Sequence, residues 1–197
     1  MRLILASVSP RRQELLGRLG ISFVTVRPEY EEQHYHEEDP EATCRRLAQG
    51  KAIQVAQRFP EDLIVGADTI VILGSQVMGK PDSLDEARRM LQALSGQTHL
   101  VKTAVALVCS DLNHQSVFVE TTEVAFHHLE EDDIERYLSV DPPLDKAGAY
   151  GIQDWSGVFV QQVAGCYHNV VGFPLARFYR HLKDNNLWPR LLALKHL

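Results

Sequence analysis

Short apolar runs alternate with helical patterns along the first half of the chain. Residues 2–6, 23–26 and 63–65 are apolar runs that suit buried strands, and residues 70–73 continue as extended chain. Leucine spacing, proline starts and a Ser-x-x-Glu capping box predict helices at 10–19, 39–58, 83–94, 130–138 and 174–183. This alternation is typical of an α/β protein.

The second half of the chain contains mainly strand patterns. Residues 100–109 and 116–126 are β-rich and are joined by a short polar turn, which predicts a hairpin. Two further short strands are expected at 158–163 and 168–171. Together the two halves predict an α/β fold, in which a mixed sheet is flanked by helices within a single domain over residues 1–197.

Composition narrows the function classes. The chain has 45% hydrophobic residues, a formal net charge of −6 and no apolar run of membrane-spanning length. An acidic protein of this kind is not expected to bind nucleic acid in general, nor to enter a membrane. Its cysteines, Cys44, Cys109 and Cys166, form no C-x-x-C pair, which argues against a zinc site and fits a reducing cytoplasm. We expect them to be small buried side chains rather than nucleophiles.

A candidate anion site lies at the start of the first helix. Ser7 follows the first strand, Ser9 is a natural N-cap and Pro10 a natural first helical residue. The first turn then contains Arg11 and Arg12, beside backbone N–H groups at the positive end of the helix dipole. A phosphate would suit this arrangement, although a solvated pair of arginines would give the same pattern.

Asp68 and Lys80 are the next candidates. Asp68 comes after the strand at 63–65, where α/β folds present side chains to ligands, and its carboxylate could bind a divalent cation or act as a general base. The alternative is an aspartate that caps a local turn. Lys80 could contact a phosphate oxygen or a metal-bound water, or it could be an ordinary solvated loop lysine. Residues 74–80 have Walker A spacing, but Pro81 replaces the required Ser or Thr, so we reject a P-loop.

Three other segments are weaker by themselves. Glu31 lies in an acidic loop and could add a metal carboxylate, whereas most loop glutamates are simply solvated. His34 and His36 are interpreted as surface histidines, and Lys51 as a solvated helix lysine.

Residues 145–153 form a small, glycine-rich segment between two structured regions. Gly148 and Gly151 permit close backbone approach, and Gln153 offers both a donor and an acceptor for the edge of a nucleobase. A tight turn whose glycines serve only the backbone would also explain the pattern.

The pieces together resemble the Maf family of nucleoside triphosphate pyrophosphatases. The matching segments occur in the family's order at 7–16, 66–69, 79–81, 94–99, 145–153 and 167–175, so the resemblance spans nearly the whole chain. It implies hydrolysis between the α- and β-phosphates, in two lobes around a deep cleft, by a fold related to the inosine triphosphate pyrophosphatases. It also implies a cytoplasmic homodimer that uses Mg²⁺ or Mn²⁺.

The resemblance also assigns roles to residues. It implies that Asp68 is the proton acceptor and that Lys80 acts with it in catalysis. The triphosphate would be held by Ser7, Arg11, Arg12, Lys51 and Lys80, and the metal by Glu31 and Asp68.

The segment at 145–153 resembles the branch that acts on dTTP and UTP, in which Arg11, Thr69 and Gln153 match the positions for base selection. Asp154-Trp155-Ser156 departs from the family's usual Gly-x-Gly and bears on fine specificity. The alternatives are the same reaction on other modified nucleotides, or a non-catalytic nucleotide-binding regulator of septum formation.

Overall fold

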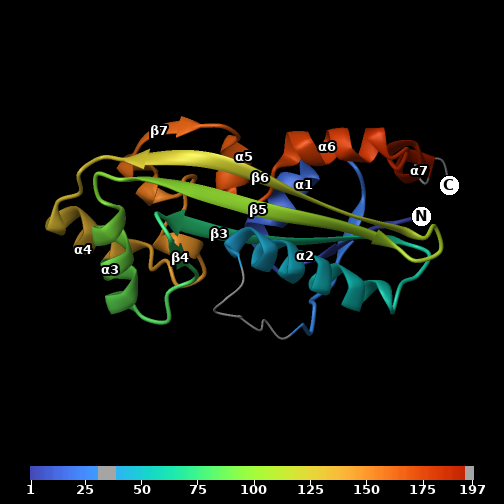
Figure 1. Cartoon of the computed structure of the whole chain (residues 1–197), viewed down its shortest axis with the longest axis horizontal. Helices are drawn as coiled ribbons and strands as arrows, with labels where there is room; N and C mark the ends of the chain where they lie inside the picture. The colour runs from blue at the N-terminus through green and yellow to red at the C-terminus, as the bar shows by residue number, and fades with distance from the viewer. Residues whose placement is uncertain (31–38, 194–197) are drawn as a thin grey trace. The chain divides into compact units, whose positions relative to one another are not determined.

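The strands of the chain form a mixed sheet in the order β2-β1-β3-β5-β6-β7, with β4 paired to β3 (Figure 1). A computed structural model of the protein describes residues 1–30 and 39–193. Within these residues the strands are β1 (Leu3–Ala6), β2 (Phe23–Thr25), β3 (Leu63–Leu73), β4 (Gln76–Met78), β5 (Thr98–Cys109), β6 (His114–Phe126) and β7 (Val160–Ala164). β1 is parallel to β2 and β3, whereas β4 is antiparallel to β3 and β7 to β6. The predicted mixed α/β fold and the β5–β6 hairpin are confirmed.

The chain divides into two units. Unit 1 comprises residues 1–68, 103–120 and 172–197, and unit 2 comprises residues 69–102 and 121–171. Strands β3, β5 and β6 contribute to both units. The single domain and the cleft between two lobes stay predictions.

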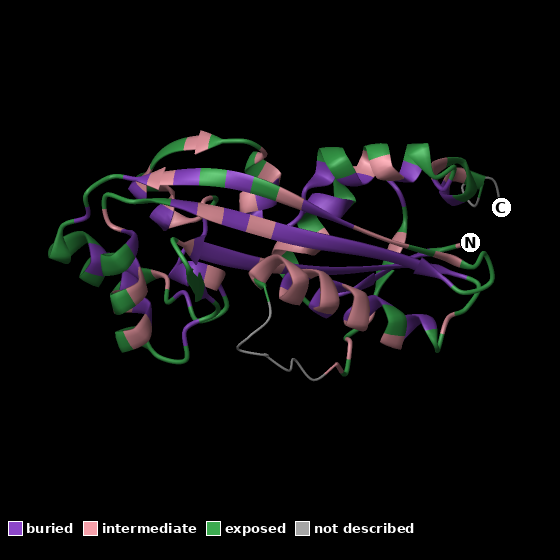
Figure 2. Ribbon diagram, in the orientation of Figure 1, coloured by how far each residue is buried: buried purple, intermediate pink, exposed green. Residues whose placement is uncertain are grey.

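Helices cover the strands of unit 1 on both faces. They are α1 (Pro10–Gly17), α2 (Pro40–Ala56), α6 (Leu175–Asp184) and α7 (Trp188–Leu192). Figure 1 shows α2 below the strands and α1 and α6 above them. All four residues of β1 and the first six of β3 are buried, because neither face meets water (Figure 2). The sequence had not indicated α7.

Unit 2 contains α3 (Leu84–Leu94), α4 (Glu131–Val140), α5 (Tyr167–Val171) and the 3₁₀ helices η1 (Ala147–Ala149) and η2 (Trp155–Phe159). The predicted capping box of α3 forms with one change. Ser83 Oγ accepts from the amide N–H of Glu86 at 3.2 Å, but the Glu86 carboxylate accepts from Asp82 rather than from Ser83. The box therefore still satisfies two backbone donors at the helix start.

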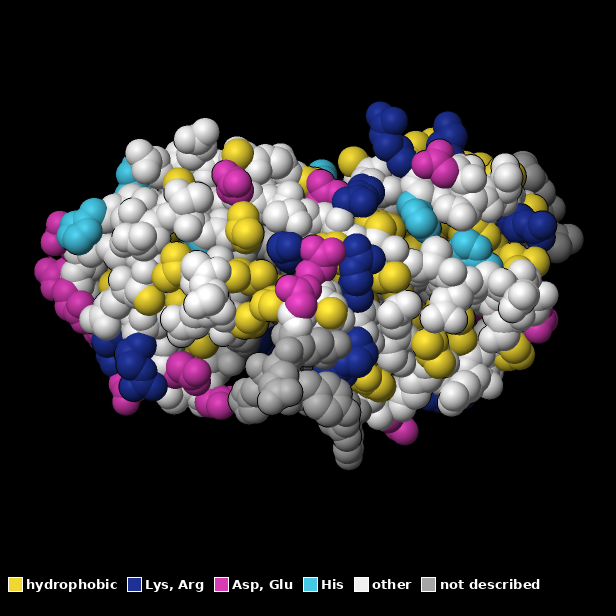
Figure 3. Space-filling model, viewed as in Figure 1, with side chains coloured by type: hydrophobic (Ala, Val, Ile, Leu, Met, Phe, Trp, Pro, Cys, Tyr) yellow, Lys and Arg dark blue, Asp and Glu magenta, His cyan; other side chains and the backbone are white. Residues whose placement is uncertain are grey.

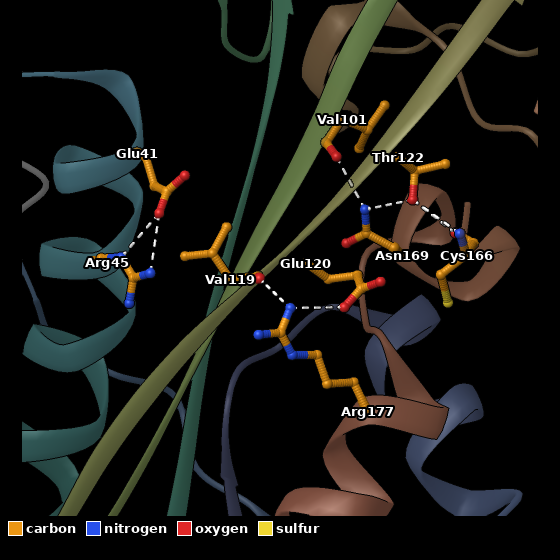
Figure 4. Close-up of polar contacts among 9 residues, drawn as sticks. All are labelled: Glu41, Arg45, Val101, Val119, Glu120, Thr122, Cys166, Asn169 and Arg177. Carbon is orange, nitrogen blue, oxygen red and sulfur yellow. Dashed lines mark hydrogen bonds and ion pairs between the residues drawn. The ribbon is translucent and has the colours of Figure 1, made fainter. Parts of the chain in front are cut away.

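The predicted strand at 168–171 is wrong, because these residues lie in helix α5. The carbonyl of Cys166 accepts the amide N–H of Asn169 at 3.0 Å, which closes a helical turn. The buried Asn169 Nδ2 donates to Val101 O and Thr122 Oγ1 at 2.9 and 3.0 Å (Figure 4). These long-range hydrogen bonds fix the turn and override the strand preference of the valines.

Two features of the structure agree with the composition: the placement of acidic side chains and the hydropathy of the helices. Helix α4 starts with Glu131, Asp132 and Asp133, and acidic side chains gather over α4 at the left of Figure 3. Among residues 1–30 and 39–193, no helix is both long and apolar enough to cross a bilayer.

Candidate active site

The end of strand β1 leads Ser7 to the start of helix α1. In the parallel β1–β3 pair Ala6, the last residue of β1, stands opposite Gly66, so Ser7 leaves the sheet beside the stretch of β3 that continues through Ala67 and Asp68. Ser7 is buried, and its Oγ accepts a hydrogen bond from the amide N–H of Ser9 at 3.2 Å. This contact bends the chain from the strand into the helix.

The first turn of α1 has the character predicted from the sequence. Ser9 stands at the N-cap in extended conformation, and Pro10 is the first helical residue. The Ser9 side chain makes no capping hydrogen bond to a described residue, and the first turn of the helix lies at the positive end of its dipole. Arg12 is oriented by a 3.0 Å hydrogen bond from Nε to the carbonyl oxygen of Gly172. Both Arg11 and Arg12 are partly buried.

A buried ion pair joins α2 to β3. Lys51 Nζ lies 2.7 Å from Asp68 Oδ1, and each residue retains 9% of its full exposure. The interpretation of Lys51 as a solvated lysine is therefore wrong. Asp68 is also placed differently from the prediction, since it lies within the continuous strand β3 rather than after a strand, which excludes a turn-capping role.

Gly66 lets the helix come close enough for this pair to form. A Cβ at Gly66 would overlap the carbonyl oxygen of Ala48 and lie 2.9 Å from the amide nitrogen of Ala52, both on α2. Only glycine permits such contact between helix and strand backbones. The resulting short separation brings Lys51 within reach of Asp68.

Cys44 packs two helical turns before Lys51 and contacts the same strand. Its thiol donates to the carbonyl oxygen of Asp68 at 3.3 Å. Burial, with the negative charge of Asp68 as a second cause, raises the pKa of Cys44 to about 12. The thiol is protonated at neutral pH, which agrees with the expectation that Cys44 is not a nucleophile.

The other predicted site residues lie in unit 2. Thr69 directly follows Asp68 in β3 and is partly buried, while Lys80 and Gln153 are exposed. The amide N–H of Gly148 donates to the carbonyl oxygen of Gly79 at 3.0 Å. This hydrogen bond ties the glycine-rich segment to the residue that precedes Lys80. Residues 74–80 do not form a phosphate loop, because β4 occupies their middle.

The conformation of Gly148 explains the glycine-rich sequence. Its φ is +68°, and a Cβ there would lie 3.0 to 3.1 Å from three side-chain atoms of Val71. Tyr150 then turns inward and its hydroxyl lies 2.8 Å from His99 Nε2. Burial lowers the pKa of His99 to about 4, so this pair is neutral and holds the segment against the core.

Asp154-Trp155-Ser156, the segment that differs from the expected Gly-x-Gly, has a structural role. The Trp155 ring stacks on Tyr137, with 5.8 Å between centroids and 12° between planes. Ser156 is fully buried, and its Oγ bonds both the amide and the carbonyl of Gly151. Trp155 therefore belongs to the aromatic packing of unit 2, and Ser156 stabilises the backbone before Gln153.

The side chains that could act as metal ligands show whether the candidate site suits a divalent cation. Within the described residues, no three His, Cys, Asp or Glu side chains form a metal-binding group, and Glu31, His34 and His36 lie outside those residues. Asp68 Oδ2 accepts no hydrogen bond from a described residue. Mg²⁺ is commonly held by one or two carboxylates together with substrate phosphates, so Asp68 fits such an ion.

Comparison with known proteins supplies the family. A family model described as Maf-like protein matches residues 2–185. The chain belongs to the Maf family. A dTTP/UTP pyrophosphatase of Thermotoga petrophila is 45% identical over 190 residues, which cover 95% of this chain and 91% of the relative. The dTTP/UTP pyrophosphatase of Bacillus anthracis is 44% identical over 186 residues, 94% of this chain and 96% of the relative.

Among solved structures, the Staphylococcus aureus Ham1 protein gives a TM-score of 0.46 at 12% identity, over 64% of this chain and 72% of the other. A likeness of this degree carries no argument about function.

One contributor to the candidate site, Lys51, has a signal that could have been found in the sequence. The buried face of α2 carries Cys44, Leu47, Ala48, Lys51 and Val55, at spacings of three and four residues. This periodicity places Lys51 on the apolar side of the helix, where a lysine needs a negative partner. The closeness of α2 to Gly66 has no comparable local signal.

Proposed function

We propose that this chain hydrolyses nucleoside triphosphates, dTTP and UTP above all, between the α- and β-phosphates. The products are a nucleoside monophosphate and pyrophosphate. Support comes from the relatives named dTTP/UTP pyrophosphatases, which are 44–45% identical over nearly the full length of this chain. Sequence identity of this extent, without a large unmatched part on either side, favours the same reaction.

The single observation that carries the chemistry is the buried Lys51–Asp68 pair. Oδ1 of Asp68 is held by Lys51 Nζ at 2.7 Å, which leaves Oδ2 for a water molecule. In the proposed reaction, Asp68 takes a proton from the attacking water as the water oxygen bonds to phosphorus. The anhydride bond then breaks and pyrophosphate departs. Lys51 orients the Asp68 carboxylate by holding one of its two oxygens.

Phosphoryl transfer needs mainly positioning and neutralisation of charge. We assign this task to Ser7, Arg11 and Arg12 at the start of α1, where backbone N–H groups add their dipole. Lys51 and Lys80 add further positive charge to the phosphates.

A divalent cation, Mg²⁺ or Mn²⁺, belongs to this proposal. Asp68 and Glu31 would hold it, and when bound it would neutralise charge on the phosphate oxygens. Its binding would compensate for the acidic composition of the chain.

Base selection is assigned to Arg11, Thr69 and Gln153. The exposed carboxamide of Gln153 offers a donor and an acceptor to the edge of a pyrimidine. We further propose a cytoplasmic homodimer that limits or cleans nucleotide pools. The free thiols of Cys44, Cys109 and Cys166 suit a reducing compartment, and light scattering after size-exclusion chromatography tests the dimer.

The test is a panel of nucleoside triphosphates with Mg²⁺ or Mn²⁺, in which pyrophosphate and orthophosphate are resolved among the products. Pyrophosphate and monophosphate from dTTP and UTP support the proposal. The same products only from other nucleotides would retain the reaction and replace the substrates. Tight binding of nucleotides without turnover would instead favour a regulator.

A further inference from the structure

Lys146 is a buried cation among three carboxylates. It is 6% exposed, and its Nζ lies 3.1 Å from Asp141, 3.4 Å from Asp154 and 3.8 Å from Asp145. A buried ammonium needs one counter-charge, and here Asp141 already provides a hydrogen-bonded one. The ion pair between Lys146 and Asp154 is therefore not needed to neutralise Lys146. Its effect is to hold the Asp154 carboxylate in place.

The same oxygen of Asp154 also holds Gln153. Oδ2 of Asp154 faces Lys146 Nζ and accepts a hydrogen bond from Gln153 Nε2 at 3.0 Å. The carboxamide oxygen of Gln153 accepts no hydrogen bond from a described residue. A chain of contacts thus runs from Lys146 through Asp154 to an exposed amide that presents its acceptor end.

This chain of contacts gives the amide one orientation. If the carboxamide rotated by half a turn, its oxygen would lie about 3 Å from the carboxylate oxygen, with two acceptors in contact and no proton between them. A carboxylate accepts only, so it selects the orientation in which Nε2 points toward it.

We propose that Asp154, held by Lys146, is a positioning residue that turns the Gln153 oxygen toward the base and so favours bases with a ring N–H. Uracil and thymine carry a proton on N3 and can donate it to this oxygen, whereas cytosine has a lone pair at that position. The inference rests on the proposed role of Gln153 in base selection.

The experiment compares kcat/KM for UTP and CTP in the wild type and in Asp154→Asn. Asparagine keeps the shape of the side chain but can either accept or donate, so both orientations of Gln153 become allowed. We expect the UTP-to-CTP ratio to fall about threefold to tenfold, since one solvent-exposed hydrogen bond changes its partner. Asp141→Asn is the matched control, because it removes a carboxylate from the same lysine without touching Gln153, and it should keep the ratio.

A double variant separates positioning from structure. If Asp154 acts through Gln153, then Asp154→Asn in a Gln153→Ala background changes the ratio no further. Should Asp154→Asn fail to fold, Asp154→Gly removes the carboxylate altogether and answers the same question.

The inference is overturned if a folded Asp154 variant keeps the wild-type UTP-to-CTP ratio. It is also overturned if Asp154→Asn lowers this ratio by the same factor in the Gln153→Ala background. A wild type that hydrolyses UTP and CTP equally well also overturns it. These outcomes leave the pyrophosphatase function standing. No hydrolysis of any triphosphate by the wild type refutes the proposed function itself, and with it the basis of the inference.

Discussion

Removal of Lys51 tests the ion pair on which the candidate site depends. In Lys51→Met the carboxylate of Asp68 loses its only hydrogen-bond donor among the described residues, and it does so in the interior. Breaking a buried pair on one side typically costs about 3–5 kcal/mol. The two side chains retain 11% and 12% of their exposure, so we expect the lower end, about 3 kcal/mol. In a chain of this size the melting temperature would fall by roughly 6–12 °C.

The assay is urea and thermal unfolding followed by circular dichroism at pH 7. Arg45→Met is the matched control on the same helix: Arg45 pairs with Glu41 (Figure 4), and both side chains are much more exposed than those of Lys51 and Asp68. It should cost about 1 kcal/mol or less. The double variant Lys51→Met/Asp68→Asn removes both charges and should recover at least half of the loss.

Two results would refute this reasoning. One is a cost below about 1 kcal/mol for Lys51→Met, which would mean that Asp68 is solvated without its partner. The other is a double variant no more stable than the single one, since the loss would then arise from packing of the lysine stem rather than from an unpaired charge.

Three further predictions concern catalysis, backbone conformation and pH. Asp68→Asn should lower the rate of pyrophosphate release at least about 100-fold, because the proton acceptor is lost, while calorimetry still detects nucleotide binding. Gly148→Ala should lower the free energy of unfolding by about 1–3 kcal/mol, because φ is +68° and Val71 fills the space, whereas Gly79→Ala should be nearly neutral. The pKa of His99 is lowered by burial from 6.5 to about 4, so stability should be full above pH 6.5 and fall as the pH drops toward 4. His99→Gln should remove on the order of 3 kcal/mol of that loss.

Each of these three predictions has a result that would contradict it. Near-wild-type turnover in Asp68→Asn would take that residue out of the mechanism. Equal unfolding energies for Gly148→Ala and Gly79→Ala would mean that the segment relaxes away from Val71. If the acid sensitivity of His99→Gln equals that of the wild type, other groups cause it.

Local patterns predicted most of the backbone. The β1–α1 connection, the start of α2 and the α3 cap depend on residues that lie within a few positions of one another, such as Ser83 and Glu86. Propensity and capping act over that distance, so they can be read from the chain. The helix at 167–171 was missed because Asn169 is held by partners 47 and 68 residues away.

The features of the candidate site also divide into those that depend on local sequence and those that depend on long-range packing. The sequence by itself proposed Arg11, Arg12 and Asp68 as candidates for phosphate-binding and acid–base chemistry, because residue type and spacing within a short segment are local properties. Only the tertiary structure decided that Lys51 is buried against Asp68 and that Lys146 anchors Asp154. These pairs depend on how closely separate segments pack, as Gly66 permits between α2 and β3. That separation is set by the packing of the core around the backbone, so no single stretch of sequence contains it.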